Sequence, residues 1–393
     1  MPYDFDRVID RRATHSIKWK LYGPDVLPLW VADMDFPAPE PVLAALRRAV
    51  RHGVFGYEFP TRELREIVAA RMDKLYGWKV SPEMVVATPG VIAGFTAAAG
   101  AVCAAGEGIL IQPPVYPPFL GVHAKAGLAR QFAPLECSAY SQELRYSVDW
   151  EAFARGLNSE GAHTGMFLLC SPHNPTGRAF SRADLQRMAE LCLKNGTAIC
   201  SDEIHAELLL GGAEHVPVAS LAPEIAARTV TLIAPSKTFN VAGLHCGFAI
   251  VAEKELRGRF KNTVERMAMH VNSLGLVAAQ AAFSGQCDGW LADLRAYLTA
   301  NRDFLAGFVR RELNGIRITV PEATYLAWLD CRELNLLPSP HKFFLEQAKV
   351  ALNEGAEFGP GGEGFVRLNF GCPRRTLEEA LERMKRALLT CAR

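Results

Sequence analysis

The lysine in the stretch Ala234–Asn240 is the residue of this sequence best placed for covalent chemistry. It follows Thr229–Ile233, whose β-branched residues are typical of a buried parallel strand. A turn after such a strand opens at the carboxyl edge of the sheet, where α/β proteins bind their ligands. Lys237 could form a Schiff base there, although an isolated Ser-Lys after a strand is also typical of an exposed loop.

Two other turns carry groups that suit a planar, phosphorylated ligand. The turn Pro89–Ile92 leads into a predicted helix, and the free N–H groups of a helix N-terminus bind phosphate without help from side chains. Tyr116 lies in the proline-rich loop Pro113–Pro118, which follows a predicted strand. A rigid aromatic ring at this place could stack on a planar ligand, and ordinary packing is the alternative.

Polar residues at two further strand ends make the pattern more specific. In Ser171–Gly177, two prolines fix the backbone around Asn174, whose amide can donate to a phenolate oxygen. Asp202 closes the next strand, and a carboxylate at that edge can hold a pyridine nitrogen protonated. A lone aspartate there is more often a helix cap, but its place in the chain between Asn174 and Lys237 favours a shared site.

The elements that would position these groups alternate from Thr61 to about Ala282. Such alternation predicts an α/β fold with a largely parallel sheet that is covered by helices on both faces. The helix predicted at Ser181–Lys194 begins with a capping serine. The predicted strands are Met84–Thr88, Gly108–Gln112, Met166–Cys170, Ala198–Ser201, Val230–Ala234 and Cys246–Val251.

The remainder of the chain predicts a second, smaller α+β domain. We expect residues 1–47 to be an arm that joins this domain, residues 48–284 to be the large domain and residues 285–393 the small one. The elements expected in the small domain are helices at Trp290–Leu313, Lys342–Ala351 and Glu378–Leu389 and strands near Ile316–Val320 and Thr324–Leu329.

The arm itself supports two interpretations. It is rich in proline and aromatic residues, and Trp19, Trp30 and Phe36 could simply pack it as a strap. Alternatively, its backbone near Ala32 and Asp33 lines the site.

Composition excludes several classes of protein. The chain has 393 residues, 49% of them hydrophobic and 22% charged, and a net charge of +1. These values argue against disorder and against an electrostatic preference for nucleic acid or an anionic membrane, so we expect a small-molecule substrate. Ten cysteines without a CxxC pair predict reduced, cytosolic residues and no metal site.

Two segments bear on localisation. The N-terminus is acidic and lacks the order of a signal peptide, so we expect a cytoplasmic protein. The stretch from Met84 to Gly106 carries no charge and is long enough to span a membrane. Pro89 and Gly90 interrupt it, and we therefore expect a strand, a turn and a buried helix of small residues.

Taken in order, Ser171–Gly177, Asp202 with His205, and Ser236-Lys237 resemble the fold-type I, pyridoxal-phosphate-dependent aminotransferase superfamily (class I/II). The resemblance covers nearly the whole chain and implies a mostly parallel seven-stranded sheet with a smaller α+β domain. The stretches that are similar to its cystathionine β-lyase, or C–S lyase, branch are Phe5–Arg12, Lys18-Trp19, Trp30–Phe36, Ser201–His205 and Ser236–Leu244. This branch cleaves a cysteine thioether to a thiol, pyruvate and ammonia.

The resemblance implies the roles of the residues around the cofactor ring. Lys237 would be the Schiff-base lysine and the proton carrier, for which it must become neutral. Asp202 would pair with the pyridine nitrogen. Asn174 and His205 would face the phenolate oxygen, and Tyr116 would stack on the ring.

The resemblance also implies a phosphate site and a substrate site. Ser236 and the backbone of Val91 and Ile92 would bind the phosphate. Tyr57 would reach the phosphate of a neighbouring subunit, which implies a homodimer with shared active sites. Arg367 would bind the α-carboxylate of an amino-acid substrate, a task that suits a planar guanidinium.

Two positions depart from a typical aminotransferase, which has tyrosine at His205 and arginine at His245. The first fits the lyase branch; the second weakens the phosphate site and leaves the role of His245 open. Transamination, decarboxylation or oxidative deamination at Cα in specialised metabolism, and a regulator without turnover are the alternatives. Lys237 and Arg367 argue against the last of these. The residues do not define the group that the substrate sulfur carries.

Overall fold

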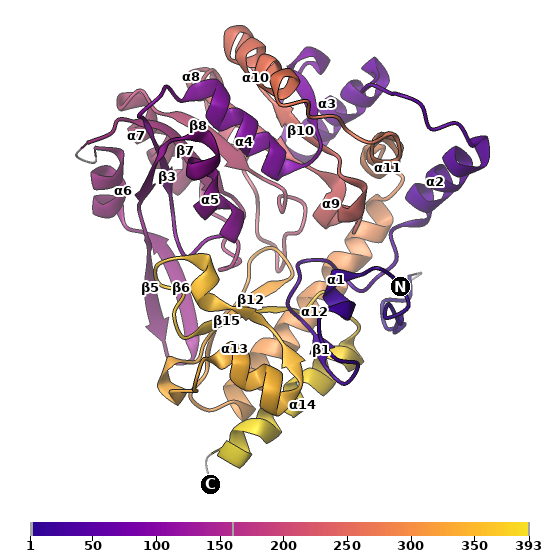
Figure 1. Ribbon diagram of the computed structural model, residues 1–393, viewed down its shortest axis with the longest axis vertical. Coiled ribbons are helices and arrows are strands. Elements are labelled where there is room, and N and C mark those ends of the chain that lie inside the picture. Colours follow the sequence, from indigo (N-terminus) through magenta and orange to yellow (C-terminus); the bar gives the residue numbers. More distant parts are fainter. Residues whose placement is uncertain (1–2, 159–160, 392–393) are drawn as a thin grey trace.

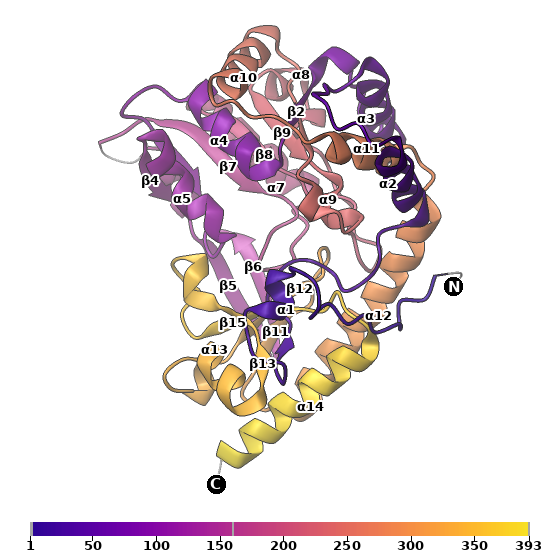
Figure 2. The ribbon, with the colours of Figure 1, turned by 45° about the vertical axis from the view of Figure 1, so that its right-hand side comes forward.

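The computed structural model describes residues 3–158 and 161–391. Its elements form two sheet-based regions, which lie one above the other in Figure 1. The upper region holds a seven-stranded sheet between helices, and the lower region holds a second sheet beside the C-terminal helices. The helix α12 (Asp288–Glu312) runs from one region into the other, as both ribbon views show (Figures 1 and 2).

The seven-stranded sheet is mostly parallel, as predicted. Its order is β2-β10-β9-β8-β7-β3-β4, and only β10 runs antiparallel to its neighbours. The strands are β2 (Val85–Thr88), β10 (Gly247–Ile250), β9 (Thr229–Ile233), β8 (Ala198–Asp202), β7 (Thr164–Cys170), β3 (Gly108–Ile111) and β4 (Ala129–Phe132). The edge strand β4 was not predicted, because its exposed sequence Ala-Arg-Gln-Phe lacks an apolar run.

Helices cover both faces of this sheet because its buried strands are apolar on both sides. On one face, Ile109 and Leu168 pack against α4 (Val91–Val102), α5 (Pro117–Ala126) and α10 (Lys254–Arg266). On the other, Leu110 and Phe167 pack against α6 (Trp150–Leu157) and α7 (Arg182–Lys194). Ser181 caps α7 by accepting a hydrogen bond from the N–H of Asp184, as the sequence predicted.

The uncharged stretch 84–106 forms β2, a turn at Gly90 and the helix α4, as expected. Within residues 3–158 and 161–391, no helix combines the length and hydrophobicity that crossing a membrane would require.

Further helices complete the large region. They are α2 (Glu40–His52), α3 (Arg62–Tyr76), α8 (Pro223–Ala226), α9 (Pro235–Thr238) and α11 (Ser273–Phe283). The helix α2 is continuous through the expected domain boundary at residues 47 and 48.

The second sheet has the order β14-β15-β12-β11-β6-β5. Its strands are β14 (Asn353–Glu354), β15 (Phe365–Asn369), β12 (Leu326–Asp330), β11 (Arg317–Thr319), β6 (Glu143–Val148) and β5 (Leu135–Tyr140). The hairpin β5–β6 comes from the sequence range that we assigned to the large domain, so the two regions are interleaved. The helices α12 and α14 (Arg374–Cys391) pack against each other beside this sheet.

The predicted end of one helix in the small domain was wrong. Instead of a helix over Lys342–Ala351, the chain forms α13 (Pro340–Phe343) and one π-helical stretch, Phe344–Ala348. Lys349 then adopts a left-handed conformation with φ 55°, which ends the helix. Val350 and Ala351 form the strand β13, which pairs in parallel with β1 (Leu27–Pro28) of the arm. Pairing with the arm therefore overrides the helical pattern.

The N-terminal arm contains α1 (Ile17–Lys20) and β1. Both ribbon views place α1 and β1 against the region of the second sheet (Figures 1 and 2). The arm continues through residues 30–36 towards α2, and this stretch contacts both sheet-based regions, as described below.

Candidate active site

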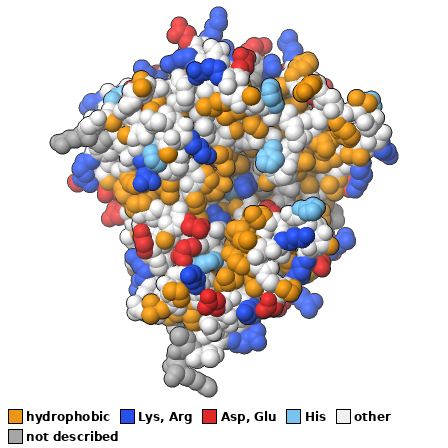
Figure 3. All heavy atoms as spheres, in the orientation of Figure 1, with side chains coloured by type: hydrophobic (Ala, Val, Ile, Leu, Met, Phe, Trp, Pro, Cys, Tyr) orange, Lys and Arg blue, Asp and Glu red, His pale blue; other side chains and the backbone are white. Residues whose placement is uncertain are grey.

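A cavity of about 200 Å³ opens at the carboxyl ends of β7, β8 and β9. It brings together Lys237, Asp202, Asn174, His205 and Tyr116, which the sequence had placed at the ends of four different strands. The other residues that line it are Ala32, Pro89, Gly90, Val91, Ile92, Ala93, Cys170, Ile204, Ser236, Ala242 and His245. Figure 3 shows the hollow between the two regions of the molecule.

Lys237 lies in α9, directly after β9, and its side chain borders the cavity. Its Nζ donates a hydrogen bond of 2.7 Å to the main-chain oxygen of Ala32. The surrounding protein lowers the pKa of Lys237 to about 8, because little water reaches the amine and because Arg367 is also positive. The carboxylates of Asp33 and Asp202 oppose this shift. A substantial fraction of the amine is therefore neutral near pH 8, and a neutral amine can accept a proton.

Asp202 is the last residue of β8 and is 3% exposed. Its Oδ1 accepts a hydrogen bond of 3.1 Å from the N–H of Ile204. Burial raises the pKa of Asp202 to about 7, although the hydrogen bond from Ile204 and the charge of Lys237 favour the carboxylate. A protonated nitrogen placed beside Asp202 would remove the cost of burying this charge.

Asn174 and His205 provide polar atoms on another wall of the cavity. The Oδ1 of Asn174 accepts a hydrogen bond of 3.0 Å from Arg367, and its main-chain oxygen accepts one of 3.1 Å from the N–H of Tyr116. Burial lowers the pKa of His205 to about 3, so the imidazole is neutral. Its Nδ1 is buried and has no hydrogen-bond partner among the described residues, although buried polar atoms are normally paired.

The turn between β2 and α4 is open to an anion. Gly90 precedes α4 with a φ of 130°, which favours glycine, and none of the side chains that the structure describes caps this helix. The backbone of Gly247 lies so close that a Cβ atom there would be 3.1 Å from the Cα of Gly90. Val91 and Ile92 begin the helix without an acidic residue in the first turn, so their N–H groups suit a phosphate.

Arg367 lies on β15, outside the cavity lining but bonded to Asn174 within it. It is 4% exposed, and its other hydrogen bonds go to the main-chain oxygen of Trp30, at 2.9 Å, and to the amide oxygen of Asn353. All three acceptors are neutral. The Nε of Arg367 is buried without a partner among the described residues, and burial lowers the pKa of its guanidinium to about 10. A carboxylate ligand would satisfy this site.

Tyr57, like Arg367, is a predicted site residue that lies outside the cavity lining. It is fully exposed, in an extended loop between α2 and α3. Val54, Phe55 and Phe59 of the same loop are exposed too. Figure 3 shows apolar side chains gathered over α2 and this loop, at the upper right.

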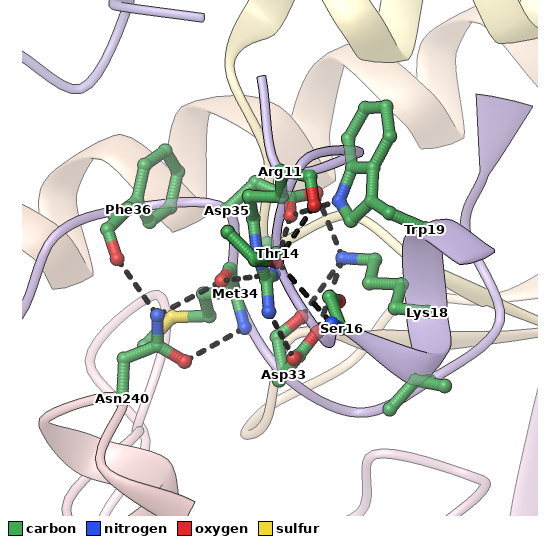
Figure 4. A network of polar contacts seen from close by, with 12 residues as sticks. Arg11, Thr14, Ser16, Lys18, Trp19, Asp33, Met34, Asp35, Phe36 and Asn240 are labelled. Atoms are coloured by element: carbon green, nitrogen blue, oxygen red, sulfur yellow. Dashed lines mark hydrogen bonds and ion pairs between the residues drawn. The ribbon is translucent and has the colours of Figure 1, made fainter. Parts of the chain in front are cut away.

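Several residues that hold the site were not predicted from the sequence. The hydroxyl of Tyr325 donates a hydrogen bond of 2.8 Å to the same Ala32 oxygen that Lys237 contacts. Asn240, three residues after Lys237, bonds to the arm (Figure 4). The pair of acidic residues in Asp33-Met34-Asp35, unusual in an apolar stretch, was the available signal for a buried ionic network.

Comparison with known proteins identifies the family. The sequence matches the aminotransferase class I and II family over residues 24–384. It is 39% identical over 392 residues to cystathionine beta-lyase PatB of Bacillus subtilis (strain 168). The aligned residues cover 98% of this chain and 100% of that protein.

Two crystal structures have similar folds. Cystalysin from Treponema denticola, which contains a pyridoxal 5'-phosphate cofactor, has a TM-score of 0.93 and 30% identity, with 100% of both chains covered. The PLP-bound C-S lyase from Staphylococcus hominis has a TM-score of 0.90 and 32% identity, over 98% of this chain and 99% of that chain. With sequence and fold in agreement over nearly its whole length, this chain belongs to the aminotransferase class I and II family, with cystathionine beta-lyases and C-S lyases among its relatives.

Proposed function

We propose that the protein is a cytoplasmic, pyridoxal-phosphate-dependent C–S β-lyase. Its substrate is a cysteine thioether, either cystathionine or another cysteine S-conjugate, which it cleaves by α,β-elimination to a thiol, pyruvate and ammonia. The observation that carries the proposal is that two basic residues, Lys237 and Arg367, occur together at the cavity. Neither side chain has an ion-pair partner among the described residues, and Asn174, which lines the same cavity as Lys237, is bonded to Arg367.

The residues of the cavity fit pyridoxal phosphate. The unpartnered Nδ1 of His205 and the uncapped N-terminus of α4 are polar groups that need a ligand. The residues that would hold the cofactor are Lys237, Asp202, Asn174, His205, Tyr116, Ser236, Val91 and Ile92. Asp202 would bind the ring nitrogen, and the first turn of α4 with Ser236 would bind the phosphate.

When bound, pyridoxal phosphate supplies an electron sink that acidifies the substrate Cα–H bond and lets the β-substituent leave. Arg367 binds the α-carboxylate and thereby fixes the position of Cα. The neutral amine of Lys237 accepts the proton from Cα at its Nζ, for which its low pKa prepares it. Asp202 keeps a proton on the ring nitrogen by offering that nitrogen a buried negative charge.

The proposal includes a homodimer in which Tyr57 completes the phosphate site of the partner subunit. The exposure of Tyr57 and of the apolar residues beside it supports this arrangement, since a loop of this kind is normally covered.

Product stoichiometry tests the reaction type. The purified holoenzyme is incubated with cystathionine and a panel of cysteine S-conjugates, while thiol, pyruvate and ammonia are measured. Equal amounts of the three products, with the cofactor still in its aldehyde form, are expected. Pyridoxamine phosphate together with a keto acid that keeps its sulfur would mean transamination, and carbon dioxide would mean decarboxylation at Cα. Either result would overturn the lyase assignment.

A further inference from the structure

Residues 30–36 of the arm are bonded through their backbone to both regions of the molecule. The main-chain oxygens that accept hydrogen bonds are those of Trp30, Val31, Ala32, Asp33, Met34 and Phe36. From the second-sheet region, the donors are Arg367, Asn369 and Tyr325. From the large-sheet region, they are Lys237 and Asn240. The position of this backbone is therefore set by both walls of the site.

Charged side chains elsewhere in the arm also bind this segment. Asp35, which is 4% exposed, accepts hydrogen bonds of 2.8 Å from Lys18, 2.9 Å from the indole of Trp19 and 2.8 Å from Arg11. Arg11 also pairs with Asp33 at 2.8 Å. Figure 4 shows these side chains converging on the segment. Removing one partner of such a network leaves another charge buried and unpaired, so the network tolerates few other positions of the backbone.

Asn240 links this segment to the turn that carries Lys237. Its Oδ1 accepts a hydrogen bond of 3.0 Å from the N–H of Met34, and its Nδ2 donates to the oxygens of Met34, at 2.8 Å, and Phe36, at 2.7 Å. Its backbone is left-handed, with a φ of 55°, a conformation that asparagine tolerates. Asn240 thus fixes residues 34–36 relative to a lysine three positions away.

The main-chain oxygen of Ala32 connects residues 30–36 to the reactive amine of Lys237. It accepts hydrogen bonds from Lys237 and from Tyr325, so both of its lone pairs are in use. A neutral amine has two N–H bonds and one lone pair. When one N–H is held by Ala32, the directions open to the lone pair are restricted, and proton transfer depends on that direction.

We propose that Asn240 and Asp35 are positioning residues for Lys237: they hold residues 30–36 so that the Ala32 oxygen orients the free amine of Lys237 for proton transfer at Cα. This role rests on the proposed function only in requiring Lys237 to act as the base. It is independent of the group that leaves from Cβ.

The test uses the holoenzyme with Asn240→Gly, because glycine keeps the left-handed backbone and removes only the side-chain bonds. Asn335→Gly is the matched control, since Asn335 is an exposed asparagine with a φ of 47°. Asp35→Asn tests the ionic network, and Asp10→Asn, at a side chain 70% exposed, is its control.

Four measurements are made: turnover of a cysteine thioether, exchange of the α-proton of alanine in D₂O, cofactor affinity, and amide hydrogen exchange of residues 30–36. Alanine has no leaving group, so its exchange reports proton transfer even if the lyase assignment fails. For Asn240→Gly we expect kcat and alanine exchange to fall together by about 10- to 100-fold. KM and the cofactor dissociation constant should change less than about threefold, while amide exchange of the segment increases. The controls should match the wild type.

The proposal is overturned if amide exchange of the segment increases while alanine exchange keeps its rate. It is equally overturned if cofactor affinity falls as much as kcat does, since the two residues would then merely maintain the cofactor site. If Asp35→Asn does not fold, Asn240→Gly alone decides.

Discussion

The Nζ of Lys237 lies 2.7 Å from the main-chain oxygen of Ala32, although 205 positions separate the two residues in the sequence. This contact joins the lysine in α9, just after β9, to an arm whose strand β1 pairs with β13 in the other region of the molecule. The arm therefore forms part of the wall around the amine. Because that wall keeps water from the amine, it contributes to the low pKa of Lys237.

The first prediction concerns the protonation of Lys237 in the cofactor-free protein. Its pKa of about 8 lies below the reference value of roughly 10.4, so the amine should become neutral, and reactive, as the pH rises through about 8. Competitive labelling with acetic anhydride, resolved by peptide mass spectrometry, measures the midpoint. The exposed Lys125 serves as the internal reference. Arg367→Ala should raise the midpoint, because it removes a positive charge; a wild-type midpoint above pH 10 would contradict the assignment.

The second prediction concerns Asp202 and stability. Burial raises its folded-state pKa to about 7, above the roughly 3.9 of an unfolded chain. Such a carboxyl group stabilises the fold fully below its unfolded pKa, and that contribution is lost as the pH rises through about 7. Asp202→Asn cannot ionise, so the cofactor-free variant should gain stability relative to the wild type between pH 4 and pH 7, by up to about 4 kcal/mol.

Urea unfolding of the two cofactor-free proteins across this pH range measures the difference. The exposed Asp10→Asn variant is the matched control and should show no such trend. If the difference in the free energy of unfolding between Asp202→Asn and the wild type stayed constant over this pH range, the pKa of Asp202 in the folded protein would not be raised.

The third prediction concerns Arg367. Replacing it by alanine should reduce kcat/KM for an amino-acid substrate by the equivalent of about 2–5 kcal/mol, because the substrate carboxylate would lose its charged partner. The kcat/KM of Arg367→Lys should lie between those of the wild type and Arg367→Ala, since lysine keeps the charge but lacks the planar guanidinium. Steady-state kinetics measure both, with Arg317→Ala on β11 of the same sheet as the control. An effect of Arg367→Ala no larger than that of the control would remove Arg367 from the substrate site.

The ends of the central strands could be predicted from the sequence, because β7, β8 and β9 are apolar runs that stop at a polar turn. Asp202 at the end of β8 and Lys237 after β9 were found in this way. The edge strand β4 lacks that signal, since it is half exposed. Contacts such as that of Tyr325 with Ala32, 293 positions apart, depend on how the two sheet regions are placed, which no local pattern encodes.

The fourth prediction concerns Arg71, whose side chain is 1% exposed. Its guanidinium bonds to Glu207 at 2.8 Å and to Asp288 at 3.0 Å, and it lies 5.5 Å from the ring centre of Phe239. Arg71→Met should lower the free energy of unfolding by about 3–5 kcal/mol, because Glu207 would remain buried without a partner.

Denaturant unfolding of the Arg71→Met holoenzyme measures this loss. Arg62→Met is the control, because Arg62 is the first residue of the same helix and its side chain is 81% exposed in a surface pair with Glu66. The control should change stability little. Equal effects of the two substitutions would show that the buried network contributes no more than a surface ion pair.

The last prediction concerns Tyr57 and the dimer. Because Tyr57 is fully exposed and is not among the residues that line the cavity of its own chain, its proposed role requires a second copy. Tyr57→Phe should weaken cofactor binding and turnover, while the exposed Tyr140→Phe, far along the sequence, should not.

Mixing subunits separates a shared site from a local one. A hybrid of one Tyr57→Ala subunit and one Lys237→Ala subunit contains two kinds of site. If Tyr57 acts across the subunit boundary, one site of the hybrid combines both defects and the other site has neither. In an equal, random mixture half the dimers are hybrids, and each hybrid has one intact site. Two nearly inactive parent proteins should therefore regenerate up to about one quarter of wild-type activity. If Tyr57 acts within its own chain, every hybrid site carries one defect and the mixture stays at the level of the parents. A monomer in analytical ultracentrifugation, or activity that does not recover on mixing, would remove Tyr57 from the partner's phosphate site and leave Ser236 and the first turn of α4 to bind it alone.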